Sequence, residues 1–289
     1  MKNKYFRIIG SGSAEAVPDS MCDCSICNNA RKIGGREIRS RSCFRVNETT
    51  QIDFGPDQFY QSVILDNDLR NVTDLLITHT HDDHFCYTEL GLREMAVKRN
   101  ETKLRVYLEK EGYKWFKNMN SGYLGGVNYF DEDLFEIIPI EYYKEYEVGK
   151  LKVIPLKGNH KSFGKNEYSS NYYITLENNK TLYYAVDSGY FFEETFSFFN
   201  VRRIDYLIME CSFGDAFTDE KPDQHMGCNG VMSVLRRLYE NGVIDSASKV
   251  YITHINHKHT LTYEKMVKYF ENENFEIPII VGYDGMFLE

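Results

Sequence analysis

A cluster of histidines and aspartates directly after a short apolar run limits most strongly what this chain can fold into. Residues 79–84 read HTHDDH, and the run before them, Leu75–Thr78, has the composition of a buried strand. Imidazole nitrogens and carboxylate oxygens are ligands for Zn²⁺, Mn²⁺ and Fe²⁺. We therefore expect a metal site where this strand ends, and the competing interpretation is a solvated polar loop.

The rest of the chain alternates strand-like and helix-like runs, without a break in composition and without an internal repeat. This order predicts one α/β domain over residues 1–289. Residues 109–148 are rich in Tyr and Phe, and we expect them to form a less regular insertion near the mouth of the site. The expected strands are Tyr5–Ile9, Cys43–Val46, Leu75–Thr78, Leu104–Leu108, Leu151–Leu156, Asn171–Leu176, Leu182–Val186, Asp205–Met209, Lys249–Thr253 and Ile277–Val281, and the expected helices are Thr88–Arg99, Asn229–Glu240 with Asn229 as its N-cap, and Leu261–Glu271.

Charge and hydropathy exclude several classes of protein. The formal net charge is −9, which disfavours general DNA or RNA binding but leaves a small phosphorylated substrate open. No run approaches the roughly 18 apolar residues of a membrane-spanning helix. The start, MKNKYFRIIG, indicates a strand rather than a secretory signal, so we expect a cytoplasmic protein with no membrane contact.

Cysteine usage points to a second metal site. The chain has seven cysteines, an odd number, and three of them, Cys22, Cys24 and Cys27, lie within six residues. In a reducing compartment this spacing favours metal binding over disulfides. Two other interpretations stay open, namely an iron–sulfur cluster completed by Cys43 or Cys211, and a set of redox-sensing thiols.

Four further residues have side chains that could bind or support a metal: Asp53, His160, Asp187 and His254. Asp53 lies in the segment QIDFG, His160 follows the predicted strand Leu151–Leu156, and Asp187 and His254 come directly after predicted strands. Alone, His160, Asp187 and His254 each have an ordinary explanation as a surface, turn or strand-end residue. Together with HTHDDH, in this order, they resemble the metallo-β-lactamase superfamily. The resemblance implies a four-layer αβ/βα sandwich and two divalent ions, zinc or manganese or iron, that hold a bridging hydroxide. It implies that one ion is bound by His79, His81 and His160, the other by Asp83, His84 and His254, with Asp187 bridging them.

Shorter motifs narrow the resemblance. They are GSGS at 10–13, CDCSIC at 22–27, ECS at 210–212, THINH at 253–257 and VGYDGM at 281–286. These resemble the family of the cyclic-phosphodiesterase accessory protein of the bacterial carbon–phosphorus lyase pathway, and similar motifs occur in an accessory protein of pyrroloquinoline quinone biosynthesis. The resemblance implies a structural zinc in an N-terminal segment of about residues 18–45, and it implies a histidine that donates a proton to the leaving group. The zinc ligands would be Cys22, Cys24, Cys27 and His257, and the proton donor would be His225. The alternative is that His225, not His257, completes the zinc site. His259 lies outside these motifs, and we expect it to be exposed.

The candidate ligands and the resemblance together predict a dinuclear metal-dependent hydrolase, most simply a phosphodiesterase that acts on a small phosphorylated molecule. The resemblance implies a cyclic phosphate on ribose as the substrate. The bridging hydroxide would attack phosphorus, with His225, Asp83 and Asp187 as the catalytic residues. Three alternatives remain: an RNA-processing nuclease, an ester or lactone hydrolase, and a non-catalytic accessory protein of cofactor biosynthesis. A homodimer is left open.

Overall fold

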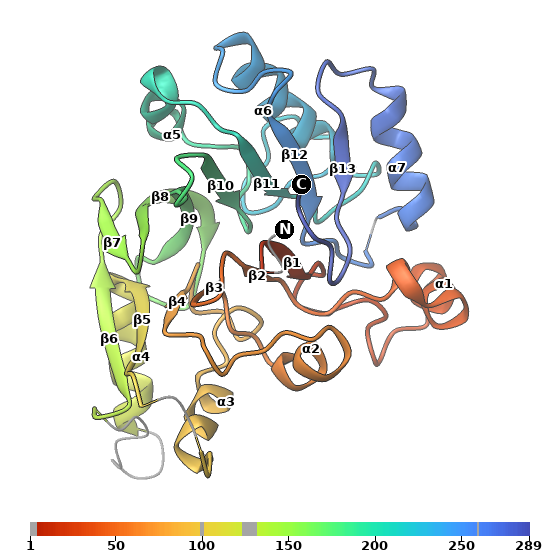
Figure 1. Cartoon of the computed structure of the whole chain (residues 1–289). Helices are drawn as coiled ribbons and strands as arrows, with labels where there is room; N and C mark the ends of the chain where they lie inside the picture. The colour runs from red at the N-terminus through yellow and green to blue at the C-terminus, as the bar shows by residue number, and fades with distance from the viewer. Residues whose placement is uncertain (1–4, 99–100, 123–131, 259) are drawn as a thin grey trace.

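Two β-sheets packed face to face, with helices on both outer surfaces, form the molecule (Figure 1). The computed structural model describes residues 5–98, 101–122, 132–258 and 260–289. One sheet has the strand order β1-β2-β3-β4-β5-β6, and the other has the order β13-β12-β11-β10-β9-β8-β7. The predicted α/β sandwich in a single domain is therefore confirmed.

The six strands of the first sheet come from the N-terminal half of the chain, and the seven of the second follow them. Their bounds are β1 Arg7–Gly10, β2 Cys43–Arg45, β3 Thr50–Ile52, β4 Asp74–Leu76, β5 Leu104–Glu109, β6 Phe135–Ile140, β7 Tyr146–Val148, β8 Leu151–Lys161, β9 Tyr168–Thr175, β10 Thr181–Ala185, β11 Tyr206–Glu210, β12 Lys249–Thr253 and β13 Ile279–Val281.

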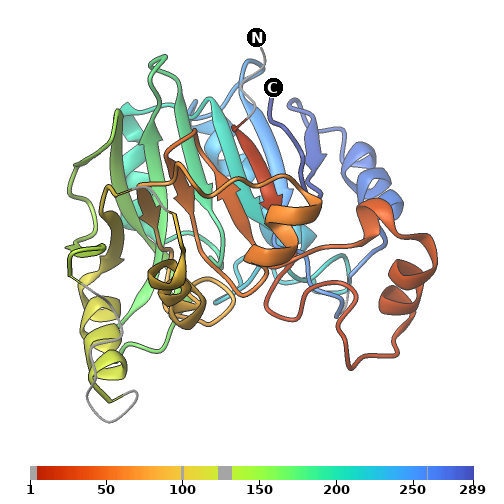
Figure 2. The ribbon, with the colours of Figure 1, turned by 60° about the horizontal axis from the view of Figure 1, so that its bottom comes forward.

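The helices lie on the outer faces and at the ends of the sheets, and Figure 2 shows α1 and α4 on opposite sides of the molecule. Their bounds are α1 Ser25–Ile33, α2 Gln58–Ile64, α3 Tyr87–Gly91, α4 Lys110–Gly122, α5 Glu193–Phe198, α6 Cys228–Glu240 and α7 Tyr263–Asn272, with 3₁₀ turns at Gly35–Glu37, Leu92–Met95 and Phe199–Val201. None of the helices in the described part of the chain is both long and apolar enough to cross a membrane.

Alternation along the strands divides the core into three layers. On β4, Leu76 points into the layer between the sheets, while its neighbour Leu75 points outward toward α3 and α4. On β10, Tyr184 points inward and Tyr183 packs under α5 and α6. Because successive strand side chains face opposite sides, each sheet buries both of its faces.

Two helix predictions were partly wrong. Thr88–Arg99 is not one helix, since α3 ends at Gly91 and a 3₁₀ turn follows it, and residues 99–100 lie outside the described part. Glycine is a weak helix former, and Met95 beyond it is 75% exposed, so little packing would extend the helix. Asn229 is not the N-cap of α6, a position that Gly227 occupies; its amide instead donates to the carbonyl of Thr218.

Residues 109–148 were expected to be irregular, and for the described residues this was wrong. They contain α4, whose Phe116 is buried, and β6, which continues the first sheet beside β5. β7 then begins the second sheet. The part of the expected insertion at residues 123–131 lies outside the described residues, as does His259.

Candidate metal centre

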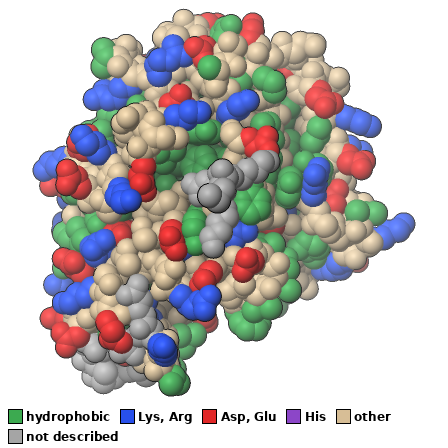
Figure 3. Space-filling model, in the orientation of Figure 1, with side chains coloured by type: hydrophobic (Ala, Val, Ile, Leu, Met, Phe, Trp, Pro, Cys, Tyr) green, Lys and Arg blue, Asp and Glu red, His purple; other side chains and the backbone are tan. Residues whose placement is uncertain are grey.

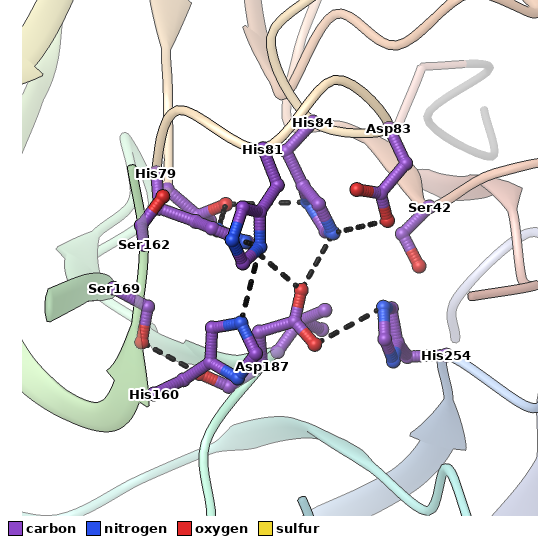
Figure 4. A network of polar contacts seen from close by, with 12 residues as sticks. Ser42, His79, His81, Asp83, His84, His160, Ser162, Ser169, Asp187 and His254 are labelled. Atoms are coloured by element: carbon purple, nitrogen blue, oxygen red, sulfur yellow. Dashed lines mark hydrogen bonds and ion pairs between the residues drawn. The ribbon is translucent and has the colours of Figure 1, made fainter. Parts of the chain in front are cut away.

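The carboxyl ends of the parallel strands of both sheets meet at one edge of the sandwich. β3 and β4 run parallel in one sheet, and β10, β11 and β12 run parallel in the other. Asp53 directly follows β3, Asp187 follows β10 by two residues, and His254 directly follows β12. The polar residues that the sequence placed at strand ends therefore converge on one site (Figure 4).

Three of these residues adopt left-handed backbone conformations, which side chains other than glycine rarely take. The φ angles are +65° at Asp53, +51° at Asp187 and +56° at His254. Each such residue costs on the order of 1–3 kcal/mol and persists only where the surrounding structure imposes it. Other non-glycine residues of the described chain, such as Asp66 and Asn179, also have positive φ, but these three carry side chains of the candidate site. Strain at such positions is common at functional sites.

The first group of candidate ligands consists of His79, His81 and His160. The Nδ1 of His81 lies 3.0 Å from the Nε2 of His79 and 3.2 Å from the Nε2 of His160. We expected His160 to follow a strand ending at Leu156, but β8 continues to Lys161. Its pairing with β9 is irregular between Lys157 and Lys161, and such a bulge re-aims a side chain, here that of His160.

The second group consists of Asp83, His84, Asp187 and His254, and Asp187 also reaches the first group. Its Oδ2 lies 2.6 Å from the Nε2 of His84 and 3.4 Å from the Nε2 of His79. Its Oδ1 lies 3.2 Å from the Nε2 of His254, and Asp83 Oδ2 lies 3.0 Å from His84 Nε2. In this position one carboxylate could serve two ions, which is the role that the resemblance implies for Asp187.

The outer ring nitrogens of these histidines are held by the protein. Asp53 Oδ2 lies 2.7 Å from His84 Nδ1, and Ser212 Oγ lies 2.8 Å from His254 Nδ1. Burial raises the pKa of Asp53, although His84 opposes that rise. Partners of this kind orient a metal-binding imidazole and select its tautomer, so that its inner nitrogen is free to bind.

The inner atoms fit divalent cations. His84 Nε2, His254 Nε2 and Asp187 Oδ1 are fully buried, and none of them makes a well-aligned hydrogen bond within the described part of the chain. Buried polar atoms without partners are costly, and a cation between them removes that cost. Imidazole and carboxylate donors suit Zn²⁺, Mn²⁺ or Fe²⁺.

His225 stands beside this centre and not in the cysteine cluster. Its Nδ1 lies 3.1 Å from Glu210 Oε2 and 3.2 Å from Asp187 Oδ1, and its ring stacks on that of His254. Burial lowers the pKa of His225, but the carboxylates of Glu210 and Asp187 outweigh burial and raise it to about 9. Glu210 also accepts hydrogen bonds from Ser188 N and Ser212 Oγ.

The cysteine cluster lies at the start of α1. Ligand atoms of Cys22, Cys24, Cys27 and His257 are all within 4.8 Å of one another, and His257 Nδ1 is 3.5 Å from Cys24 Sγ. Burial raises the pKa of the Cys24 thiol, but hydrogen bonds with the Cys27 amide and with His257 outweigh burial and lower this pKa to about 6. Cys43 lies against Asp53 and not in this cluster. The donor set suits one tetrahedral zinc ion.

A cavity of about 280 Å³ opens onto the candidate ligands and His225. Glu15 and Lys258 both line the cavity and form an ion pair with each other. Sequence reasoning assigned no role to either residue, or to Glu210 and Ser212. Nothing in their spacing marked them, although Glu210 and Ser212 belong to a motif already noted. On the face shown in Figure 3, Lys and Arg side chains are interspersed with Asp and Glu.

Comparison with known proteins agrees with this geometry. The family model described as the β-lactamase superfamily domain matches residues 51–255, so the chain belongs to that family. No curated protein sequence matches the chain. Solved structures that share the fold include a diphosphatase of the PhnP family, with 18% identity, a TM-score of 0.68 and coverage of 98% of this chain and 96% of that one.

Two further structures extend the likeness over whole chains. Zn²⁺-bound PqqB from Methylobacterium extorquens has 17% identity, a TM-score of 0.75 and 99% coverage of both chains. Yeast PDE1 has 14% identity, a TM-score of 0.70 and 100% coverage of both. At these identities the likeness shows a shared metallo-β-lactamase fold.

Proposed function

We propose that this chain is a dinuclear metal-dependent phosphodiesterase that acts on a small phosphorylated molecule, such as a cyclic ribose phosphate. The observation that carries the proposal is the placement of Asp187 between two groups of inward-facing histidines, with His225 at the cavity wall. Bound divalent ions would supply a water of lowered pKa and positive charge for the phosphoryl oxygens.

His225 fits the role of proton donor. Its Nδ1 faces Glu210, which leaves Nε2 to carry a proton toward a leaving alkoxide. Glu210 is held in turn by Ser188 N and Ser212 Oγ, so it fixes the orientation of the His225 ring. Asp187 and Asp83 would act as ligands that place the ions and not as acids or bases.

The cavity supports a small substrate. Its volume of about 280 Å³ lies just below the usual range of roughly 300–1,000 Å³ for ligand pockets. Among the described residues that line it, Lys258 is the one Lys or Arg, and Glu15 neutralises it. A polynucleotide would gain little electrostatic attraction from such a wall, which disfavours the nuclease alternative.

The test is hydrolysis of bis(p-nitrophenyl) phosphate by metal-stripped protein to which Zn²⁺, Mn²⁺ or Fe²⁺ is returned in turn. We expect activity to disappear with chelation and to return with at least one ion. A panel with a cyclic ribose phosphate, a lactone, an aryl ester and structured RNA then separates the alternatives. Turnover of the lactone, ester or RNA in preference to the cyclic phosphate would contradict the proposal.

A further inference from the structure

The loop between β8 and β9 presents an aromatic side chain beside the candidate metal centre. Phe163 is 49% exposed, and its ring centroid lies 4.7 Å from that of His81 in an edge-to-face arrangement. On its other side Trp115 of α4 lies 5.6 Å away, with the two rings inclined by 31°. An aromatic surface therefore begins one imidazole ring away from the cavity that His81 lines.

A buried carboxylate holds this loop against the histidine segment. Glu167 is 2% exposed, and its Oε1 accepts a hydrogen bond of 2.9 Å from the backbone N–H of Thr80, the residue between His79 and His81. Its Oε2 accepts from the Thr80 hydroxyl and from Gly164 N, directly after Phe163. Glu167 thus couples the position of Phe163 to that of His81.

The same carboxylate sets the approach of α4. A Cβ at Gly112 would lie 2.7 Å from Glu167 Oε1, so the helix can pack this closely only because residue 112 has no side chain. Trp115 is three residues further along α4 and therefore lies on the same face as Gly112. Phe163, Trp115 and His81 are in this way assembled around one buried group.

Simple packing does not explain Phe163. Isolated exposed apolar residues are common on protein surfaces, and Phe59 on α2 is 79% exposed. Phe163, however, belongs to none of the three core clusters of the described residues. It is also the one apolar side chain in the loop SFGKNE at 162–167. Its defined contacts are with a candidate metal ligand and with Trp115.

We propose that Phe163 and Trp115 form a stacking platform for a planar base, so that the preferred substrate is a nucleotide-type phosphodiester. The inference deepens the proposed function and rests on it. The small cavity would hold the phosphate and sugar, and the base would extend over the rim onto Phe163. Aromatic side chains bind any nucleobase through its ring face, so the platform selects for a base without selecting among bases.

Trp115 provides a direct readout, because it is the one tryptophan of the chain. The metal-loaded protein is titrated with adenosine 5′-monophosphate, which has no phosphodiester bond to hydrolyse, and with ribose 5-phosphate. We expect the nucleotide to quench Trp115 fluorescence and to bind about 5- to 100-fold more tightly than the sugar phosphate. Equal affinity of the two compounds would overturn the platform.

Variants of Phe163 test the chemistry of the contact. Phe163→Ala should remove most of the nucleotide's advantage, and Phe163→Tyr should retain it. Phe163→Leu should behave like Phe163→Ala, because leucine keeps apolar volume but has no ring face. Unchanged affinity in Phe163→Leu would contradict stacking, and Phe59→Ala is the matched control for loss of an exposed phenylalanine.

Kinetics separate this inference from the proposed function. With a nucleoside 2′,3′-cyclic phosphate, Phe163→Ala should raise KM with little change in kcat, and with a cyclic ribose phosphate that lacks a base neither should change. Absence of hydrolysis by the wild type together with base-dependent binding would reject the phosphodiesterase and leave the platform. Hydrolysis of both substrates with no effect of Phe163→Ala would reject the platform and leave the phosphodiesterase.

Discussion

The candidate dinuclear centre and the cysteine cluster are built in opposite ways. The dinuclear centre takes its residues from strand ends in both sheets and opens onto a cavity. The cysteine cluster takes three of its four residues from one short segment, in which Cys24 is also the N-cap of α1. They meet in one loop, which carries His254 for the first and His257 for the second.

The protein itself holds the candidate ligands of the dinuclear centre in place, whereas we expect the cysteine cluster to depend on its metal ion for local folding. At the dinuclear centre, Asp53 and Ser212 hold the histidines through their outer nitrogens, and buried strands fix the backbone. At the cysteine cluster, α1 is a nine-residue helix with two buried residues, so little apolar packing holds it in place. Loss of a ligand should therefore impair chemistry at the first site and local stability at the second.

Asp187→Ala should have the largest effect on turnover. Both ions would lose the carboxylate they share, and metal ions contribute several kcal/mol of transition-state stabilisation, so kcat/KM should fall by at least about 10³-fold. The fold should persist, as judged by circular dichroism. Asp82→Ala is the control, because Asp82 lies in the same HTHDDH segment but is exposed and belongs to neither candidate ligand group. Similar losses in the two variants would contradict the assignment.

His225→Ala should come next. A general acid is worth about 10²–10⁴-fold on an alkyl phosphodiester, whose leaving group needs a proton. The loss should be smaller on a p-nitrophenyl ester, because nitrophenolate leaves without one, and metal content should be unchanged. Equal losses on the two substrates would indicate phosphate binding instead, and a loss of zinc would make His225 a metal ligand.

Asp53→Asn should weaken metal binding without removing a ligand. The amide cannot match the carboxylate that orients His84, and partners of this kind are worth about 10–100-fold in metal affinity or activity. Excess metal should restore most of the turnover, and the measurement is activity against free metal concentration. Asp68→Asn on the surface is the control, and a loss of turnover that saturating metal does not restore would argue that Asp53 does more than orient His84.

Cys24→Ala should change turnover of the folded protein least and stability most. Structural zinc contributes directly to folding, so the melting temperature should fall by roughly 5–10 °C. Elemental analysis should find about three ions per chain in the wild type and one zinc fewer in the variant. Cys86→Ala is the control. Wild-type melting combined with lost activity would mean that the cysteines serve catalysis.

Most strands and the ligand candidates could be predicted because their signals are local, although β3, β6 and β7 were not predicted. Apolar runs such as Leu182–Val186 are short and uninterrupted, and HTHDDH is compact enough to be recognised without a fold. The role of Glu210 could not be predicted, because it depends on a contact with His225 fifteen residues away that only the loop after β11 creates. The end of β8 was also missed, since the bulge that carries His160 leaves no apolar signal.

The sequence by itself determined which chemistry is available: histidines and carboxylates for one site and thiols for another. It also determined the alternation of strands and helices that predicts an α/β fold. Only the tertiary structure decided how these groups meet. It placed Asp187 between two histidine groups, put Phe163 beside His81 and turned three residues into left-handed conformations. The physical reason is that ligand identity belongs to single residues, whereas distances between residues as far apart as His79 and His254 depend on the packing of the two sheets.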